Sequence, residues 1–357
     1  MIAIVHTWDR TSLSKVESLV KQGVQFSRIF LLGGQEWEYS DTIGGRVGGI
    51  YILLEVAKKQ NLILEIITGS AKESKLLIDT KFVNYYRMHY WENYWLTQTY
   101  SAFLQKAELG YIEQDIRQDI FNKNYDFCIV SLNNRPHTHR CLMIDLMAKY
   151  SLIDNNAVSW REATYSGEYT KQGLLPSVSR GYKYQYWEPK LLILDNQNPL
   201  NFDFYSLPKE YHKSFCQLVI ESTIDVPFFT EKTSIPLLCL KPFIGASVQG
   251  YHKSLERRGF VLYTELFDYS FDSIEDCEHR FEEIAKNLTR INSLSKTELG
   301  LLYDKILDKL LYNKQHAIKL ATRLEYQPEI LKEIYTYTLH SSNDNDIGFN
   351  DNFINYS

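Results

Sequence analysis

The sequence lacks any long hydrophobic run. Its apolar stretches, such as LLPSV and PLLCL, fall far short of the roughly 18 residues that a membrane-spanning helix needs. The amino terminus, MIAIVHTWDR, has neither the basic start nor the long apolar middle of a secretory signal peptide. These absences argue against a membrane-spanning or exported protein, so we expect a cytoplasmic location.

Cysteine is also scarce. The five cysteines are scattered and form no CxxC pair, which argues against both a disulfide framework and a structural zinc site. An excess of basic residues is missing as well, because the formal net charge is −5. A broad basic face for gripping nucleic acid is therefore not expected. A local basic patch for a phosphate-bearing small ligand stays compatible with this charge.

Several nucleotide-binding and metal-binding motifs are absent. The glycine pairs Gly33-Gly34 and Gly44-Gly45 do not form the GxGxxG pattern of dinucleotide sites, and no GxxxxGK[ST] phosphate loop occurs. The one DxD pattern, DND at 344–346, lies in a polar, Asn-rich tail. Neither an NAD site nor a metal site is predicted.

What the sequence does contain is an alternation of strand and helix patterns. In the first half, apolar runs at 28–36 and 62–70 read as strands and flank a segment with helical spacing at 48–61. The aromatic-rich segment 82–110 is expected to form one long buried helix. This half therefore predicts a Rossmann-like domain over residues 1–115.

A second alternating series begins near residue 122. Its expected elements, in chain order, are strand 125–131, helix 140–152, strand 157–162, strand 214–223, a short helix in SIPLLCL, strand 241–247, helix 250–260 and strand 261–264. Helical spacing then continues from 273 to about 340. We predict an α/β fold of two Rossmann-like domains facing a cleft, the second spanning residues 116–340 with a helical ending, followed by a polar tail at 341–357.

Ligands of open parallel sheets bind beyond the carboxyl ends of the strands, and a first polar cluster has this placement. The loop LNNRPHTHR follows a predicted strand and carries Asn133, Arg135, His137 and Arg140 just before a helix. Arginines near a helix start can hold a phosphate through charge-assisted hydrogen bonds. A solvated loop whose side chains cap neighbouring elements is an equally open reading.

A second cluster follows the strand at 214–223. Glu221 ends that strand, and Thr230, Glu231, Lys232 and Thr233 precede the next apolar run. A carboxylate beside a helix start can accept the hydroxyls of a ribose, and the neighbouring ammonium suits a phosphate. These residues are therefore candidates for holding a nucleotide.

The alternative for this cluster is an ordinary helix start. Thr230 or Ser234 would then cap the helix, and Glu231 would favour its dipole. Pro236 favours a cap at Ser234, because a cap at Thr230 would place the proline beyond the first turn. Under that reading Glu231 and Lys232 lie on the approach to the helix.

A third, weaker cluster lies near the amino terminus. His6 and Asp9 follow a short apolar start, and Glu36 follows a predicted strand and the Gly33-Gly34 pair. Each could act as a general base, with Glu36 preferred, although a structural role is the favoured interpretation for each.

Two of these segments resemble a known family. FFTEKTSIPLLCLKPFIGASVQGYHKSLERRGF is similar to a signature of fucosyltransferase-like glycosyltransferases of bacteria and large DNA viruses, including bacteriophages. SLNNRPHTHRCLMIDLMAKYSLIDNNAVSW resembles an upstream element of the same family, in the same order and spacing. The resemblance covers about residues 125–263, and the serine and isoleucine after TEKT depart from it, which leaves the donor base and sugar open.

The resemblance implies a two-domain fold of the GT-B type with a nucleotide-sugar donor held by the C-terminal domain. Family members contact the donor ribose and diphosphate through the Glu and Lys of the TEK element, which correspond to Glu231 and Lys232. An upstream arginine contributes to diphosphate binding, for which Arg135 is the first choice and Arg140 the second.

The expected activity is transfer of a sugar from a GDP- or UDP-linked donor to the hydroxyl of a glycan or other acceptor. The transfer of a hexosyl or pentosyl group would be inverting and independent of metal, with no further cofactor, and would occur in the host cytoplasm if the protein is viral. Two alternatives stay open, a DNA-modifying glycosyltransferase, disfavoured by the acidic charge, and a non-catalytic nucleotide-binding α/β protein.

Overall fold

Two four-stranded parallel sheets organise the part of the chain that the structure describes. The structure is a computed structural model, and the residues that it describes are 2–6, 11–33, 47–68, 80–87, 90–106, 125–133, 136–160, 182–190, 192, 194, 207–222, 224 and 227–322. These residues form two units, called here unit 1, up to Asn93, and unit 2, Tyr94–Thr322. The α/β class predicted from the alternating pattern is confirmed.

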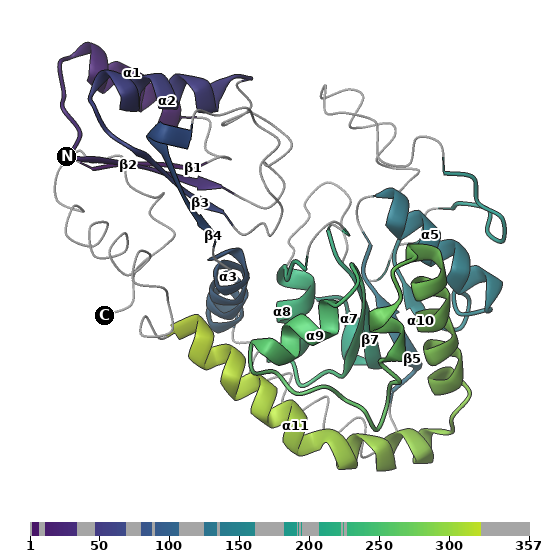
Figure 1. The fold of residues 1–357 in the computed structure, drawn as a ribbon. Coiled ribbons are helices and arrows are strands. Elements are labelled where there is room, and N and C mark those ends of the chain that lie inside the picture. The colour runs from purple at the N-terminus through teal and green to yellow at the C-terminus, as the bar shows by residue number, and fades with distance from the viewer. Residues whose placement is uncertain are drawn as a thin grey trace. The chain divides into compact units, whose positions relative to one another are not determined.

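In unit 1 the strands lie in chain order, β1-β2-β3-β4, and all pair in parallel. Because right-handed crossovers between successive neighbours always return over the same face, α1 and α2 cover one side of this sheet (Figure 1). The elements are β1 (Ile2–His6), α1 (Ser12–Lys21), β2 (Arg28–Gly33), α2 (Gly49–Lys59), β3 (Leu64–Thr68), the 3-10 turn η2 (Thr80–Phe82) and β4 (Val83–Arg87).

Unit 2 has the strand order β6-β5-β7-β8, again all parallel. The chain moves outward from β5 to β6 and then returns to the other side of β5, so the order reverses between β5 and β7. The strands are β5 (Phe127–Ser131), β6 (Ala157–Val158), β7 (Ser214–Ile220) and β8 (Phe243–Ala246). In open α/β sheets such a reversal leaves a crevice at the carboxyl ends of the two strands.

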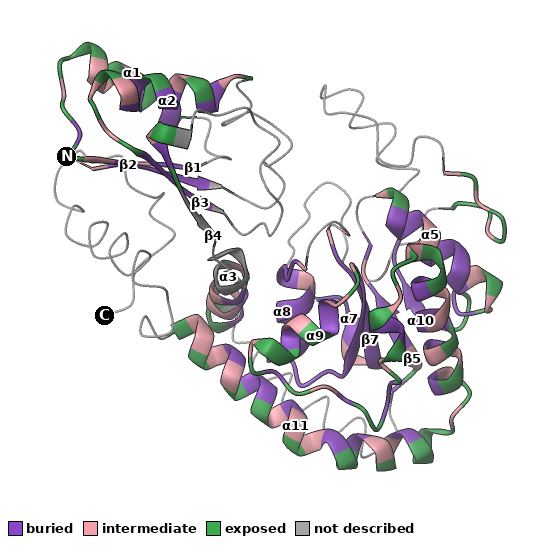
Figure 2. Ribbon diagram, in the orientation of Figure 1, coloured by how far each residue is buried: buried purple, intermediate pink, exposed green. Residues whose placement is uncertain are grey.

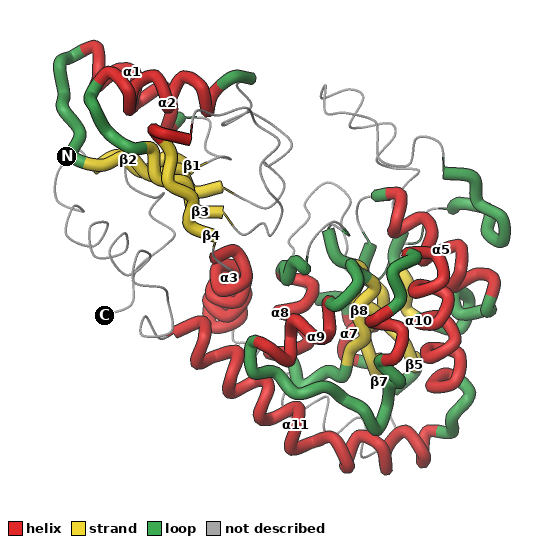
Figure 3. The backbone as a smooth tube through the Cα atoms, in the orientation of Figure 1, coloured by secondary structure: helices red, strands yellow, loops and turns green. Residues whose placement is uncertain are grey.

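Helices cover both faces of the second sheet (Figure 3), with α5 and α10 in contact on one side and α8 and α11 on the other. Strand β7 is buried along its whole length, as is β8 (Figure 2). The helices are α3 (Tyr90–Lys106), α5 (Thr138–Lys149), α7 (Lys209–His212), α8 (Glu231–Leu238), α9 (Tyr251–Arg257), the 3-10 turn η3 (Ser270–Ser273), α10 (Cys277–Asn292) and α11 (Lys296–Thr322).

Three details differ from the sequence-based expectations. The segment 82–110 is not one helix, because its first part forms the edge strand β4 before α3 begins. Helix α3 packs Leu96 and Phe103 into the core of unit 2, so the division between the units falls earlier than residue 115. The predicted strand 261–264 is a loop, because the amide and carbonyl of Val261 bond to the side chain of Asn313 on α11.

A buried Asp–His pair fixes α9 against the sheet. The amide of Gly245 in β8 donates to Nε2 of His252 at 3.0 Å, so the imidazole proton sits on Nδ1 and is donated to Asp272, also at 3.0 Å. Asp272 further accepts the amides of His252 and Lys253 in the first turn of α9. Burial works to raise the pKa of Asp272, but the bonds from His252 and Lys253 outweigh it and hold that pKa below its ordinary value.

We expect Asp272→Asn to lower the free energy of unfolding at pH 7 by about 2 kcal/mol, because the asparagine loses the charge that three donors face. An Asp whose folded-state pKa is depressed stabilises the fold above its unfolded pKa of about 3.9, and that contribution is lost as the pH falls through the folded value. The difference between variant and wild type should therefore shrink below about pH 4. Urea unfolding at several pH values measures this difference in the free energy of unfolding. Asp304→Asn, at an exposed position of α11, is the neutral control. A difference that does not change with pH would contradict the assignment.

Candidate functional site

Two helix starts meet the carboxyl ends of the central strands of unit 2. Strand β5 leads through a short loop to α5, and β7 leads through a longer one to α8. Because β5 and β7 are neighbours and parallel, the amino termini of both helices lie at the same edge of the sheet, at the reversal of strand order. The partial positive charge of each helix start favours an anion at this edge.

Glu231 and Lys232 form an ion pair at the start of α8. Nζ of Lys232 lies 2.5 Å from Oε1 of Glu231 and also donates to the hydroxyls of Ser222 and Thr230, at 3.3 and 3.4 Å. The exposed fractions of their side chains are 7% for Glu231 and 16% for Lys232, so both still reach the surface. A pair this close to solvent can exchange its internal contacts for those of a ligand.

Charge and burial act in opposite directions on Glu231. Burial works to raise its pKa, but Lys232 and then Arg140 lower it, and the pKa lies below its ordinary value. The carboxylate of Glu231 is therefore ionised at neutral pH. The influence of Arg140, which belongs to α5, links the starts of the two helices electrostatically.

The start of α8 is fixed by Thr230. Its hydroxyl accepts the amide of Lys232 at 3.3 Å, and helix α8 begins at Glu231. The preference for a cap at Ser234 is therefore wrong, and Pro236 lies inside the helix. Ser234 instead donates its hydroxyl to the carbonyl of Thr230. The alternative of a helix start is thus confirmed for Thr230, and the Glu231–Lys232 pair occupies the first turn.

The carboxylate of Glu221 holds the first turn of α8 in place. Its side chain is fully buried, and its carboxylate accepts the amide and hydroxyl of Thr230, the hydroxyl of Thr233 and the amide of Ser222. Burial raises the pKa of Glu221 above its ordinary value, although Lys232 and the donors from Thr233 and Thr230 act in the opposite direction. With its oxygens engaged in this way, Glu221 positions the start of α8.

The main chain of Glu221 reaches the other helix. Its carbonyl lies 2.8 Å from Nε2 of His139 and accepts from Nη2 of Arg140 at 3.3 Å, and both residues belong to the first turn of α5. One residue at the end of β7 therefore holds the first turns of α5 and α8 together. His139 belongs to the LNNRPHTHR segment, but its bond to Glu221 could not be inferred from residue spacing.

The remaining predicted residues of the first cluster flank α5. Asn133 is buried, its main-chain amide donates to Ser159 Oγ at 2.8 Å, and its Nδ2 donates to Ser131 Oγ at 3.0 Å. Within the described part of the chain, its Oδ1 is a buried acceptor with no hydrogen-bond partner. His137 is the residue before α5, and its ring stacks on that of His139 with centroids 5.6 Å apart.

The structure thus brings together Arg140, Glu221, Thr230, Glu231 and Lys232, and the hydroxyl of Thr233 bonds to Glu221. Arg135, Asp9 and Glu36 lie outside the described residues, and His6 is described only as the last residue of β1, where it pairs with Leu32. Ser222, whose hydroxyl accepts a hydrogen bond from Nζ of Lys232, is a member of the site that was not predicted from the sequence. Its position directly after Glu221 at a strand end was the available signal.

Metal sites, membrane-spanning helices and similar proteins also bear on the function. The described residues contain no group of three or more His, Cys, Asp or Glu side chains placed to hold a metal ion. None of their helices combines the length and the apolar character that crossing a membrane requires. No family model, curated protein or solved structure matches the chain.

Proposed function

We propose that this protein is a glycosyltransferase that binds a nucleoside-diphosphate sugar at the carboxyl edge of β5 and β7. The observation that carries the proposal is the joining of two helix starts by Glu221, with the Glu231–Lys232 pair and Arg140 in their first turns. The resemblance of the TEKT and NRPHTHR segments to fucosyltransferase-like enzymes, together with a GT-B arrangement of two facing domains, is part of this proposal.

The charges at this edge suit the two halves of a nucleotide's sugar-phosphate. Lys232 and Arg140 are cations beside helix starts, and both are matched to a diphosphate. Glu231 is an ionised carboxylate that can accept the two hydroxyls of a ribose. Binding would replace the contact between Glu231 and Lys232 by one contact of each residue with the ligand.

In the proposed reaction, the bond between the anomeric carbon and the diphosphate oxygen breaks, and a bond from that carbon to the acceptor oxygen forms. A carboxylate or imidazole takes the proton of the acceptor hydroxyl, for which Glu36, Asp9 and His6 are the candidates. Lys232 and an arginine, Arg135 or Arg140, stabilise the negative charge on the departing nucleoside diphosphate. The acceptor is a glycan or another hydroxyl compound, and inversion is expected.

The test is calorimetric titration of the intact chain with GDP and UDP. For the nucleotide that binds, we expect Lys232→Ala to raise the Kd by about 30-fold or more, because a hydrogen bond to a charged group contributes about 2 kcal/mol. Lys253→Ala, an exposed lysine of α9, is the matched control and should leave the Kd unchanged. Equal affinity of all three proteins, or binding of neither nucleotide, would refute the proposed site.

The role of Glu231 can be distinguished from that of Lys232 by removing a hydroxyl group from the ligand. Wild type should bind the 2′-deoxy nucleotide about tenfold more weakly than the ribonucleotide, because the carboxylate loses one donor. Glu231→Ala should bind the two nucleotides equally. If the variant keeps the discrimination, another residue reads the ribose.

Activity is then measured as release of nucleotide from the matching donor sugar, with and without saccharide acceptors. Nucleotide binding without any release or transfer would identify a non-catalytic binding protein. Transfer to DNA in preference to saccharides would identify the DNA-modifying alternative.

A further inference from the structure

A second feature of unit 2 lies at the other end of α5. The segment 182–190 crosses this helix without regular secondary structure, and a single buried carboxylate, that of Asp145, holds it. Asp145 accepts the amides of Gln185 and Tyr186 at 2.8 Å and of Trp187 at 3.0 Å. It also accepts the hydroxyl of Tyr182 at 3.2 Å.

These bonds fix the position of one aromatic side chain. The indole of Trp187 packs edge-on against Trp160, with centroids 5.7 Å apart, and against Tyr184, at 5.6 Å. Trp160 is fully buried, so it provides a rigid support. With its main chain held by Asp145 and its ring held by two neighbours, Trp187 loses little conformational freedom when a ligand contacts it.

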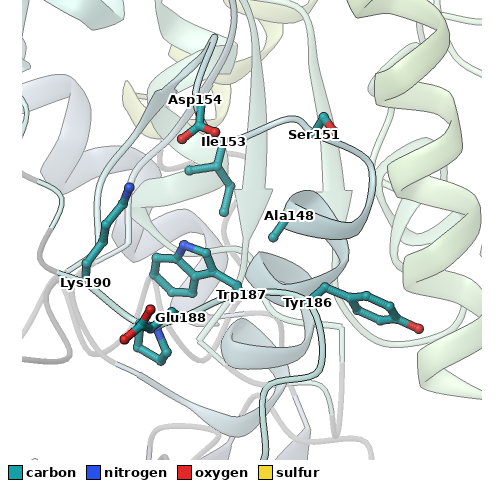
Figure 4. A pocket seen from close by; sticks show the side chains of 9 residues that line it. Ala148, Ser151, Ile153, Asp154, Tyr186, Trp187, Glu188 and Lys190 are labelled. Atoms are coloured by element: carbon teal, nitrogen blue, oxygen red, sulfur yellow. The ribbon is translucent and has the colours of Figure 1, made fainter.

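Trp187 lines a cavity of about 450 Å³ (Figure 4). The buried Ile153 contributes a further apolar surface, and Asp154, Glu188 and Lys190 are exposed side chains around the indole. The volume lies within the range of about 300–1,000 Å³ that is usual for small-molecule sites. The lining thus combines an indole and an apolar side chain with charged groups of both signs.

The cavity is separate from the candidate nucleotide site. Ala148 and Ser151 place it at the carboxyl end of α5, whereas Arg140 and the nucleotide site lie at the amino end. A helix of 12 residues is about 18 Å long, so one small ligand does not occupy both places.

We propose that this cavity binds the ring of a neutral saccharide. The indole offers a flat apolar surface for the C–H face of a sugar ring, and the carboxylates of Asp154 and Glu188 accept its hydroxyls, while Lys190 donates. Two carboxylates and one ammonium give the rim a formal charge of about −1, which disfavours a phosphate or other anion. This binding does not depend on the proposed transferase activity.

Saturation-transfer NMR on the intact chain tests the proposal with the methyl glycosides of glucose, galactose, N-acetylglucosamine and fucose. We expect at least one of them to bind with a Kd near about 1 mM and to receive saturation on its ring protons. Trp187→Ala should raise that Kd at least tenfold, and the paired change Asp154→Asn with Glu188→Gln should raise it about fivefold, each hydrogen bond contributing modestly. The paired change leaves Trp187 and its anchor Asp145 in place, so its effect is not one of folding.

Tyr312→Ala is the matched control, because it removes an exposed aromatic ring from α11, outside the cavity lining. It should leave the saccharide signal unchanged. The proposal is overturned if none of the four glycosides binds below about 20 mM, if binding survives Trp187→Ala, or if tetramethylammonium or glucose 6-phosphate binds more tightly than every glycoside. The same variants should keep the wild-type Kd for the nucleotide, so this result is independent of the test of the nucleotide site.

Discussion

Gly245→Ala is expected to destabilise unit 2 by about 3 kcal/mol, at the upper end of the usual cost of overpacking. A Cβ atom built on Gly245 would lie 2.2 Å from Cε1 of Tyr251 and 2.9 Å from its Cδ1. The ring cannot retreat easily, because Tyr251 is fully buried, packs on Phe229, and hydrogen-bonds its hydroxyl to Thr233 in the first turn of α8. The glycine in β8 therefore makes room for a ring that supports the candidate site.

The measurement is urea unfolding followed by circular dichroism. Gly300→Ala is the matched control, since a Cβ at this helical position meets nothing within 4 Å. That change should stabilise the protein by about 0.5–1 kcal/mol, because alanine has the higher helix propensity. The same substitution is thus expected to have opposite signs at the two glycines, and a loss of equal size at both would refute the packing argument.

A double-mutant cycle shows whether the clash is with Tyr251. Tyr251→Ala alone should cost about 3–5 kcal/mol through the cavity that it leaves. In that background Gly245→Ala should cost less than about 1 kcal/mol, because its partner in the clash is gone. If the free-energy losses of Gly245→Ala and Tyr251→Ala were additive, the strain would not come from contact between these two residues.

The alternation of strands and helices in unit 2 could be predicted because it depends on local patterns. Strands β7 and β8 are buried along their length and therefore appear as continuous apolar runs. The helix predicted at 140–152 corresponds to α5, which the structure has at Thr138–Lys149. The same patterns placed Arg140, Glu231 and Lys232 after strands, where the structure has them. Parallel pairing of β5 with β7 then brings them to one edge.

What could not be predicted depends on partners far along the chain. The loop at Val261 has the composition of a strand, but Asn313, 52 residues away, bonds its main chain. The tyrosines that follow Val83 fit a buried helix as well as an edge strand, and the pairing of β4 with β3 decides between them. Thr230 caps α8 in spite of Pro236, because Glu221 holds the amide and the hydroxyl of Thr230.

Glu221 is the residue whose interpretation changes most. The sequence places it at a strand end and makes its carboxylate a candidate for holding the donor nucleotide. In the structure that carboxylate is fully buried and faces donors from Ser222, Thr230 and Thr233. This burial points to a role in positioning the proposed nucleotide site, which experiment can distinguish from direct contact with the ligand.

Glu221→Gln is expected to cost about 3 kcal/mol of stability, although the two side chains have nearly the same size. Oε1 accepts the amide of Thr230 and Oε2 accepts the amide of Ser222. A backbone N–H cannot rotate away, so the –NH2 group of glutamine meets a donor in either orientation. Glu256→Gln, an exposed position on α9, is the control and should change the free energy of unfolding by less than about 0.5 kcal/mol.

Nucleotide binding by Glu221→Gln separates positioning from contact. If Glu221 acts only through α5 and α8, the ribonucleotide and the 2′-deoxy nucleotide should lose affinity by the same factor, about tenfold or more, because both depend on the placement of the first turns. A direct contact with the ribose would instead abolish the discrimination between the two nucleotides, as is expected for Glu231→Ala. Titration at a temperature where the variant is fully folded, as judged by circular dichroism, makes this comparison independent of the lost stability. Unchanged affinity in the folded variant would show that the bridge from the end of β7 to both helices is not needed for the site.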